Sequence, residues 1–430
     1  MIEKLYNAYL QSRKVTTDSR AITPGCIFFA FKGTNFNGNA FVQQALDQGA
    51  ALCVMSDPSY YVDERCLVVD DVLDTLQALA KYHREHLNIP IIGITGTNGK
   101  TTTKELVHAV LSRRYRTSAT QGNHNNHLGV PLTLLEIPAN AEIAIVEMGA
   151  NHPGEIAELC TIAQPNFGLI TNVGRAHLEG FGSFEGVIKT KTELYRHLAS
   201  CKGTAFVNAD NEILMREANN CGLTTVSYGA SHGAQVSGHL VGSDPYMKFY
   251  MEDGDNVYSI QSQLLGNYNF DNAMAAAAVG RFFRVDYWDI KEAIEQYAPA
   301  NKRSQYKETE SNTLFLDCYN ANPSSMKVAL DNFETLNKDH KVAMLGGMKE
   351  LGADSQQEHQ AIADRLVAMG IEGVLVGPEF EFAKNISPSI QWFDNVEAAI
   401  IHFQQNPLRG ATVLLKGSNG TRMWLMEEVL

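Results

Sequence analysis

Residues 93–103, Gly-Ile-Thr-Gly-Thr-Asn-Gly-Lys-Thr-Thr-Thr, are the stretch of sequence that decides the fold of this chain. The glycines allow backbone N–H groups to point at a polyphosphate without Cβ clashes. Lys100 can reach the outer phosphates, and Thr101 offers a hydroxyl to a magnesium ion at the positive end of a helix. The apolar residues 91–94 predict a buried strand before this loop, and residues 100–111 predict a helix after it. The stretch therefore predicts a nucleotide-binding loop.

The spacing of this loop differs from the standard phosphate-binding loop. That loop has a glycine five residues before the Gly-Lys pair, where this chain has Ile94. We interpret residues 96–101 as a variant, because the strand, the Lys-Thr pair and the helix all lie in register. The alternative is a glycine-rich turn without a function.

Length and charge restrict the class of protein. A chain of 430 residues is too long for one hydrophobic core, and we expect three domains. Its 44% hydrophobic and 19% charged residues are ordinary for a globular protein. A formal net charge of -13 argues against sequence-independent nucleic-acid binding, which needs a basic surface. A local basic pocket for an anionic small molecule is compatible with this charge.

The cysteines and the N-terminus indicate the compartment. The seven cysteines are odd in number, scattered, and without metal-ligand spacing, which predicts free thiols in a reducing compartment. Residues 1–6 are too polar for a signal peptide, and no apolar run approaches the roughly 18 residues of a membrane span. We therefore expect a cytoplasmic protein without membrane insertion.

Alternating strand and helix patterns predict an α/β fold of three domains. We expect a small N-terminal α/β domain at 1–86, a central P-loop-type domain with a mostly parallel sheet at 87–298, and a C-terminal Rossmann-like domain at 299–430. The N-terminal domain should contain a strand at 26–31 and a helix at 40–48. The strands expected in the other two domains are at 91–95, 143–146, 167–171 and 205–207, and at 314–317, 342–345, 374–376 and 412–416.

A different pattern begins within the central domain. From residue 226 to 265 polar and apolar residues alternate, and residues 247–251 and 257–260 flank the turn Glu-Asp-Gly-Asp, which predicts an added β-hairpin region. An alanine-rich helix at 272–283 then closes this domain. Proline and small residues predict a linker around 297–301.

Polar side chains follow the predicted central strands. Glu147 and His177 come just after strand ends, as does Thr101 in the loop. The carboxyl ends of parallel strands meet at one edge of a sheet, where ligands bind. Carboxylate and hydroxyl oxygens together with an imidazole can share magnesium ions that bridge phosphates. An isolated Glu or His after a strand is more often a solvated loop residue, but convergence beside a phosphate loop favours metal binding.

Other polar residues leave alternatives open. Lys189 and Lys191 lie in a predicted helix, where their pattern alone predicts an exposed face. The Asn-rich segments 122–127 and 319–323 suit amide, sugar or base edges, but such segments also form ordinary turns. We expect surface or supporting roles for six histidines without zinc-type spacing, namely His83, His86, His124, His127, His152 and His359.

Taken together, these motifs resemble the Mur ligase family of ATP-dependent, amide-forming enzymes of peptidoglycan precursor synthesis, nearly from end to end. Residues 96–102 are similar to the family's ATP loop, which accounts for the spacing. Gly-Asn-His-Asn-Asn at 122–126, followed by Gly-Val-Pro-Leu at 129–132, is similar to the family segment near the substrate. The resemblance implies ATP and Mg²⁺ as cofactors.

The resemblance also implies roles for individual residues. Lys191 occupies the position of the family's carbamylated lysine, and a buried lysine loses its proton easily and reacts with CO₂ to become an anionic ligand. The implied catalytic residues are Lys100, Lys191 and His177. The implied metal ligands are Thr101, Glu147, His177 and Lys191. The implied nucleotide-binding residues are Gly96, Thr97, Asn98, Gly99, Lys100, Thr101, Thr102, Asn269, Asn272, Arg303, Asp317 and Asn320. The implied substrate-binding residues are Ser19, Arg20, Asn123, Asn125 and Asn126.

Two segments indicate a subgroup of the family. Residues 147–156 and 319–326 are similar to the versions in members that add D-alanyl-D-alanine, and the Asp-Asn-Pro-Arg-type motif of members that add the third amino acid is not found. The implied substrates are UDP-N-acetylmuramoyl-tripeptide and D-alanyl-D-alanine, joined through an acyl phosphate by a monomeric enzyme. The alternatives are a sibling that adds the third residue, a P-loop small-molecule kinase, and a nucleotide-dependent switch protein.

The chain departs from the family pattern at three places. Asn37-Gly38-Asn39 replaces the frequent Asp-Gly-His, Gly346-Gly347-Met348 replaces Gly-Asp-Met, and Asn419 replaces an arginine. Contacts made by those family residues are not transferred to this chain.

Overall fold

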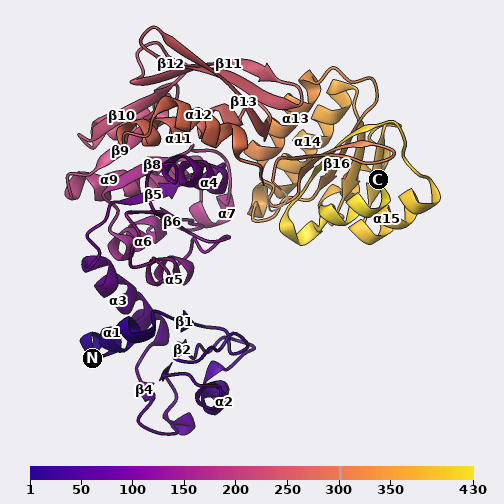
Figure 1. Ribbon diagram of the computed structural model, residues 1–430. Helices are drawn as coiled ribbons and strands as arrows, with labels where there is room; N and C mark the ends of the chain where they lie inside the picture. Colours follow the sequence, from indigo (N-terminus) through magenta and orange to yellow (C-terminus); the bar gives the residue numbers. More distant parts are fainter. Residues whose placement is uncertain (300–302) are drawn as a thin grey trace.

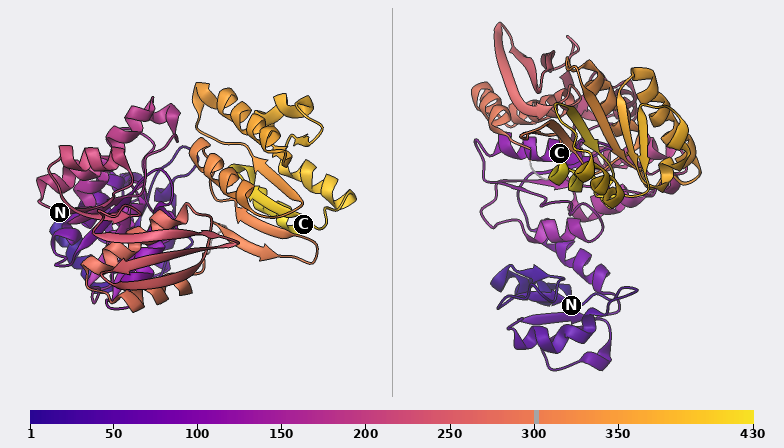
Figure 2. Two further views of the ribbon diagram at one scale, coloured as in Figure 1. Left: turned by 90° about the horizontal axis from the view of Figure 1, so that it is seen from above. Right: turned by 90° about the vertical axis from the view of Figure 1, so that its right-hand side faces the viewer.

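The computed structural model describes residues 1–299 and 303–430, which form three sheets that follow one another along the chain (Figure 1). The N-terminal part lies at one end of the molecule, as the right view of Figure 2 also shows, and the C-terminal part lies beside the central part, as the left view of Figure 2 shows. The predicted three-part α/β fold is confirmed. The domain limits at 86 and 298 remain a prediction, and the linker predicted at 297–301 extends outside the described residues.

The N-terminal sheet is small and parallel, with the order β1-β2-β3-β4. Its core contains Cys26, Cys53 and Cys66, so these cysteines cluster although they are scattered in sequence. The strand and helix predicted here are shorter than expected, since Asn37 starts a 3₁₀ turn before the helix. The elements are α1 (Ile2–Ser12), β1 (Val15–Thr16), β2 (Ile27–Phe29), η1 (Gly38–Phe41), α2 (Val42–Asp47), β3 (Leu52–Met55), η2 (Pro58–Tyr60), β4 (Cys66–Val68) and α3 (Val72–Glu85).

Helix α3 joins this part to the central one. It packs against α5 and α6 of the central part as well as α1. The buried Arg84 donates from Nε to the Ala163 carbonyl oxygen at 3.0 Å and from an Nη to the Gln164 carbonyl oxygen at 2.9 Å. These bonds cap the exposed carbonyls at the end of α6 and fix the angle between the two parts.

The central sheet has nine strands in the order β13-β12-β11-β10-β9-β8-β5-β7-β6. Its strands are parallel from β6 to β11, and β11, β12 and β13 are antiparallel, as the predicted hairpin requires. The strands are β5 (Ile91–Thr95), β6 (Thr117–Ala119), β7 (Ile143–Glu147), β8 (Phe167–Ile170), β9 (Thr204–Asn208), β10 (Thr224–Gly229), β11 (Val236–Ser243), β12 (Tyr246–Asp253) and β13 (Asn256–Leu265).

Helices cover both faces of the central sheet, which explains why its middle strands are apolar on both sides. One core cluster lies under α5, α6, α8 and α9, and the other under α4, α11 and α12. The helices are α4 (Lys100–Leu111), α5 (Gly129–Leu135), α6 (Glu155–Ala163), α7 (Leu178–Phe181), α8 (Phe184–Lys191), α9 (Glu193–Ser200), α10 (Glu212–Asn220), α11 (Asn269–Phe282) and α12 (Tyr287–Gln296).

The C-terminal sheet has the order β14-β15-β19-β16-β17-β18, and all its pairs except β14–β15 are parallel. Asp317 and Lys416 end its neighbouring strands β15 and β19. The elements are β14 (Gln305–Glu308), β15 (Thr313–Asp317), α13 (Pro323–Thr335), β16 (Lys341–Gly346), η3 (Gly352–Asp354), α14 (Ser355–Met369), β17 (Glu372–Val376), η4 (Pro378–Asn385), β18 (Ile390–Phe393), α15 (Val396–Gln405), β19 (Thr412–Lys416), η5 (Asn419–Thr421) and η6 (Met423–Val429).

Within the described ranges, no helix combines the length and the apolar composition needed to cross a membrane.

Candidate active site

A cavity of about 1070 Å³ lies where the central part meets the C-terminal part, and α3 supplies one wall through Leu73, Asp74 and Gln77. It gathers most of the predicted site residues at the carboxyl ends of the strands, as parallel sheets require. Those that line it are Thr97, Asn98, Gly99, Lys100, Thr101, Thr102, Asn123, Asn125, Asn126, Glu147, His177, Asn269, Asn272, Arg303, Asp317 and Asn320.

The predicted phosphate loop connects β5 to α4. Gly99 precedes α4 with a φ of +78°, and a Cβ there would lie 2.6 Å from Oδ1 of Asn272, so both the conformation and the space require glycine. The Asn98 N–H donates to Oδ1 of Asn172 at 3.0 Å, and the Thr171 hydroxyl donates to the Asn98 carbonyl oxygen at 2.6 Å. The end of β8 therefore holds the loop in place.

Lys100 turns back over this loop. Its ammonium donates to the carbonyl oxygens of Gly96 at 2.7 Å and Thr97 at 3.0 Å. Burial lowers the pKa of Lys100 to about 8, Glu147 opposes this effect, and Arg303 adds to it. A cation poised in this way can exchange two carbonyl contacts for phosphate oxygens without leaving the cavity.

Asparagines connect α11 to α4. The Thr103 hydroxyl donates to Oδ1 of Asn272 at 3.0 Å, and Nδ2 of Asn272 donates to Oδ1 of Asn269 at 2.9 Å. Nδ2 of Asn269 in turn donates to the Leu265 carbonyl oxygen at 2.7 Å. All three polar side chains are buried, so this series of hydrogen bonds holds the two predicted nucleotide-binding asparagines beside the loop.

Glu147 ends β7 with its side chain only 1% exposed. Its Oε1 accepts from the Thr101 hydroxyl at 3.2 Å and from Nδ2 of Asn125 at 2.8 Å. Its Oε2 is buried and accepts no hydrogen bond from the described residues. The nearest cation of an ion pair is the ammonium of Lys104, 4.0 Å from Oε2. A buried carboxylate oxygen with spare acceptor capacity beside a hydroxyl suits a magnesium ion.

The donor set limits how a metal could bind. No group of three or more His, Cys, Asp or Glu side chains within residues 1–299 and 303–430 is arranged to hold an ion. Thr101 and Glu147 supply oxygens on one side only, so phosphate oxygens of a nucleotide would have to complete the coordination. The residues therefore fit magnesium bound together with a nucleotide, and not a structural metal.

His177 and Lys191 are placed differently from each other. His177 lines the cavity just before α7, and its Nδ1 pairs with Glu350 of the C-terminal part. Burial lowers the pKa of His177, and Glu350 opposes that effect. Lys191 lies behind the cavity wall, where its ammonium donates to the carbonyl oxygen of Ala150 at 3.2 Å. Ala150 itself lines the cavity.

The pattern-based prediction of an exposed Lys191 is wrong, because the side chain is 2% exposed while Lys189 on the same helix is exposed. Helical position alone did not reveal that the segment after β7 covers Lys191. Burial holds the pKa of Lys191 well below its usual value, and Lys100 lowers it further, while Glu155 and Glu193 oppose both. An amine of this kind is suited to the carbamate that the resemblance implies.

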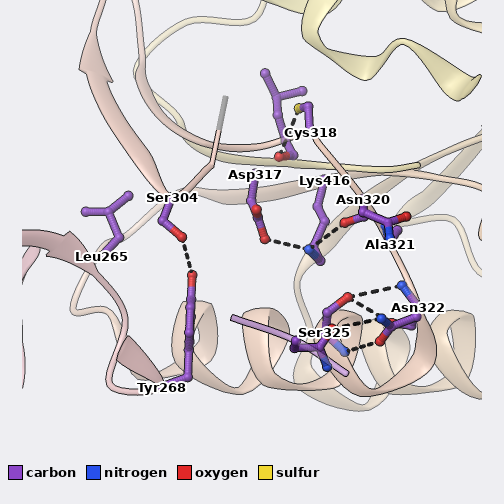
Figure 3. A network of polar contacts seen from close by, with 12 residues as sticks. Leu265, Tyr268, Ser304, Asp317, Cys318, Asn320, Ala321, Asn322, Ser325 and Lys416 are labelled. Atoms are coloured by element: carbon purple, nitrogen blue, oxygen red, sulfur yellow. Dashed lines mark hydrogen bonds and ion pairs between the residues drawn. The ribbon is translucent and has the colours of Figure 1, made fainter. Parts of the chain in front are cut away.

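The C-terminal part contributes a second wall, shown from close by in Figure 3. The buried Lys416 donates to Oδ2 of Asp317 at 2.5 Å and to the Asn320 carbonyl oxygen at 3.2 Å. The Tyr268 and Ser304 hydroxyls lie 3.0 Å apart. Asp317 and Lys416, which end β15 and β19, therefore hold each other in place at the cavity wall, and polar groups fixed in this way suit the binding of a small molecule.

Hydrogen bonds join the phosphate loop and the nearby residue Arg175 directly to the start of α13. Nδ2 of Asn322 donates to Oδ1 of Asn98 at 2.8 Å, and the Arg175 N–H donates to the Ser324 hydroxyl at 2.8 Å. Asn322 also caps α13 by accepting from the Ser325 N–H. The Asn-rich segment at 319–323 is thus both a turn and part of the site.

Besides Lys191, three predicted residues lie away from the cavity lining. Gly96 is in the loop but not in the lining. Ser19 and Arg20 are in the N-terminal part, where Ser19 is buried and Arg20 pairs with Asp18 at 2.7 Å on the surface. Asn126 does line the cavity, and its Oδ1 accepts from the N–H of Gly129, the first residue of α5, at 2.8 Å. The roles of these residues, like those of all the other predicted site residues, remain predictions.

Sequence reasoning missed several polar residues of the site. Lys416 and Tyr268 line the cavity, and Lys104 lies directly behind Glu147. Lys416 ends a predicted strand, and that position could have identified it. Lys104 gave no such signal, because a lysine four residues after Lys100 is usually an exposed helix residue. Among the histidines expected at the surface or in supporting roles, His83 and His359 are buried.

Three protein-family models match successive parts of this chain. The Mur ligase middle domain matches residues 94–280, and the domain described as Mur ligase, glutamate ligase domain matches residues 302–419. The domain described as Mur ligase family, catalytic domain matches residues 12–84.

Curated relatives match over nearly the whole chain. A protein of Bacillus subtilis (strain 168) named UDP-N-acetylmuramoyl-tripeptide–D-alanyl-D-alanine ligase is 34% identical over 424 residues, covering 95% of this chain and 91% of the relative. The Escherichia coli (strain K12) protein of the same name is 33% identical over 434 residues, covering 99% and 95%.

Solved structures of similar proteins also match nearly the whole chain. MurF from Acinetobacter baumannii has 31% sequence identity and a TM-score of 0.86, covering 97% of this chain and 92% of that chain. MurF ligase from Thermotoga maritima in complex with ADP has 28% identity and a TM-score of 0.86, covering 98% and 97%.

Proposed function

Because the chain belongs to the Mur ligase family, as its motifs predicted, we propose that it joins D-alanyl-D-alanine to UDP-N-acetylmuramoyl-tripeptide with ATP as the energy source. Relatives and solved structures with this activity in their names support the proposal over nearly the full length. The observation that carries it is one cavity that Lys100, Glu147 and Arg303 share with a wall from α3. A site for a nucleotide alone would not need the wall from α3.

In the first step, the carboxylate of the tripeptide attacks the γ-phosphorus of ATP, and the bond to ADP breaks. Two anions must approach each other, and the charges of Lys100 and Arg303 reduce their repulsion. Lys100 acts at the phosphates after its ammonium leaves the loop carbonyls. The product of this step is an acyl phosphate.

In the second step, the amine of D-alanyl-D-alanine attacks the acyl carbon. The new C–N bond forms, the C–O bond to phosphate breaks, and inorganic phosphate and a proton leave. The acyl phosphate is sensitive to water, and the bonds that join the phosphate loop to α13 hold the C-terminal part over the cavity. Exclusion of water is therefore the role that we assign to Asn322 and Ser324.

Magnesium, when bound, supplies positive charge that stabilises the transferring phosphoryl group. Thr101 and Glu147 are the residues that would hold one ion, with nucleotide oxygens as further ligands. His177 and a carbamate on Lys191 would hold another. The orphaned Oε2 of Glu147 and the buried amine of Lys191 are the observations that support these assignments.

The remaining site residues fall into two groups. We assign Asn269, Asn272, Arg303, Asp317 and Asn320 to the nucleotide, because they surround the cavity beside the phosphate loop. We assign Ser19 and Arg20 to the UDP group and the asparagines of segment 122–127 to the tripeptide. The two ends of a long substrate then meet different parts of the chain.

Mass spectrometry of the product tests the function. Wild-type protein with ATP, Mg²⁺, UDP-N-acetylmuramoyl-tripeptide and D-alanyl-D-alanine should yield the UDP-pentapeptide, ADP and phosphate. Lysine or diaminopimelate offered with the UDP-dipeptide should yield no product. Addition of either would assign the chain to the sibling activity, and a phosphorylated product without amide formation would assign it to a kinase.

We also propose a cytoplasmic monomer. Dependence on ATP supports the cytoplasm, and so does the finding that none of the seven cysteines, all within the described ranges, forms a disulfide. Sedimentation of the purified protein at micromolar concentration tests the monomer.

A further inference from the structure

Lys104 is a completely buried lysine in α4, one helical turn after Lys100, and the proposed mechanism does not use it. Its ammonium donates to the carbonyl oxygens of Thr120 at 2.6 Å and Gly122 at 3.4 Å. It also pairs with Oε1 of the partly exposed Glu105 at 3.0 Å. Burying an ammonium is costly unless its donors and its charge are compensated, so a buried lysine in this place requires an explanation.

The Lys104 ammonium lies 4.0 Å from Oε2 of Glu147, the oxygen that accepts no hydrogen bond. Within the described chain, no other lysine, arginine or histidine nitrogen comes within 4.0 Å of the Glu147 carboxylate. The opposite oxygen, Oε1, is already bonded to Thr101 and Asn125. Lys104 therefore supplies the nearest positive charge to the oxygen that faces a metal in the proposed function.

Thr120 fixes the geometry of this pair from the end of β6. Its hydroxyl accepts from the Glu147 N–H at 2.9 Å, while its carbonyl oxygen accepts from Lys104. Glu147 is held on β7 and Lys104 on α4, and both are buried. Thr120 thus fixes the Lys104 ammonium relative to the backbone of Glu147, and Thr101 and Asn125 hold the carboxylate itself.

We propose that Lys104 is a positioning residue that sets the magnesium affinity of Glu147. The inference rests on the proposed function in taking Glu147 as a magnesium ligand. In the metal-free protein, the ammonium compensates the buried carboxylate. With magnesium bound, the ammonium and the dication repel each other across the same carboxylate, which weakens metal binding and favours release after each turnover.

The first test compares magnesium binding by wild type and Lys104→Met, whose side chain is similar in length and uncharged. Magnesium is titrated by calorimetry into each protein saturated with ADP. The variant should bind magnesium about ten-fold more tightly, the change expected for removing one nearby like charge in a partly screened site. A purely structural role would leave the affinity unchanged or weaken it, and either result would overturn the proposal.

Glu105→Gln is the matched control. It removes the other carboxylate partner of the same ammonium but leaves the charge beside Glu147. Its magnesium affinity should equal that of wild type. An increase as large as that of Lys104→Met would overturn the proposal, because it would assign the effect to loosening of α4.

The second test is the stability of metal-free protein in EDTA. Lys104→Met should unfold at lower urea concentration than wild type, since Glu147 loses its compensating charge. The double variant Lys104→Met/Glu147→Gln should recover part of that loss. If the single variant does not fold, the double variant should fold. A double variant no more stable than the single one overturns the pairing.

Failure of this inference differs from failure of the proposed function. Wild-type ligation of D-alanyl-D-alanine with unchanged magnesium affinity in Lys104→Met would disprove the role of Lys104 alone. Absence of ligation by wild type, together with tighter magnesium binding in Lys104→Met, would disprove the proposed substrate and leave the role of Lys104 in place.

Discussion

The guanidinium carbon of Arg303 lies 3.5 Å from the centre of the Tyr319 ring. The Nε of Arg303 is buried and has no hydrogen-bond partner among the described residues. Stacking on an aromatic ring holds the planar guanidinium in one orientation while leaving N–H groups available for an anion. We therefore expect Arg303 to be oriented for a phosphate group before the nucleotide arrives.

We expect Arg303→Lys to raise the KM for ATP by about ten-fold or more, since lysine loses both the stacking and the planar set of donors. Initial rates at varied ATP measure the effect. Arg281→Lys is the matched control, because Arg281 stacks on Tyr287 at 4.0 Å on a helix face outside the cavity lining. Equal changes in both variants would contradict a role for Arg303 at the nucleotide.

Lys100→Ala should lower kcat by about 10²–10³-fold, the usual cost of removing one electrostatic contact to a transition state. Stability should change little, because within residues 1–299 and 303–430 the ammonium donates hydrogen bonds to carbonyl oxygens of its own loop alone. Turnover at saturating ATP and urea unfolding measure the two effects. Near-normal turnover would remove Lys100 from the mechanism.

Lys191→Arg should be nearly inactive if a carbamate is the working group, because arginine cannot form one and its cation repels magnesium. With ¹³C-labelled bicarbonate, wild type should give a carbamate NMR signal that Lys191→Ala lacks. Lys189→Ala, on the exposed face of the same helix, should keep both activity and signal. Substantial activity of Lys191→Arg would mean that the residue acts as a positive charge.

The sequence predicted most of the central and C-terminal strands, because their apolar runs are buried on both faces by helices. It also predicted the phosphate loop, because the conformation of such a loop requires glycines at local positions that the sequence shows directly. It did not predict β6, a three-residue strand without a buried apolar run. Short elements of this kind depend on neighbours that are distant in sequence.

The same limit applies to the site. Glu147 and Thr101 were identified because each follows a predicted strand, and the sheet brings strand ends together. The burial of Lys191 depends on Ala150, and that of Lys104 depends on Thr120, and helical periodicity contains neither contact. Lys191 and Lys104 are therefore buried where helical periodicity predicts exposed lysines, and both place an amino group beside the proposed site.

The last prediction concerns stability and His83 of α3. Its ring is buried against Tyr6 and Tyr9, whose hydroxyls lie 3.3 and 3.4 Å from Nδ1 and Nε2. Burial, with smaller contributions from the charges of Arg13 and His86, lowers the pKa of His83 from 6.5 to about 4. Between pH 6.5 and pH 4, His83 therefore binds a proton in the unfolded chain but stays neutral in the folded chain. The free energy of unfolding decreases as the pH falls through this range.

Between pH 7.5 and pH 5, this residue should reduce the free energy of unfolding by about 2 kcal/mol. His83→Gln keeps a polar side chain that cannot titrate, so its stability should lack this part of the decrease. Urea unfolding of both proteins at pH 7.5, 6 and 5, followed by tyrosine fluorescence, measures the difference. A stability difference between wild type and His83→Gln that stays constant across this range would show that His83 binds its proton equally in the folded and unfolded chain.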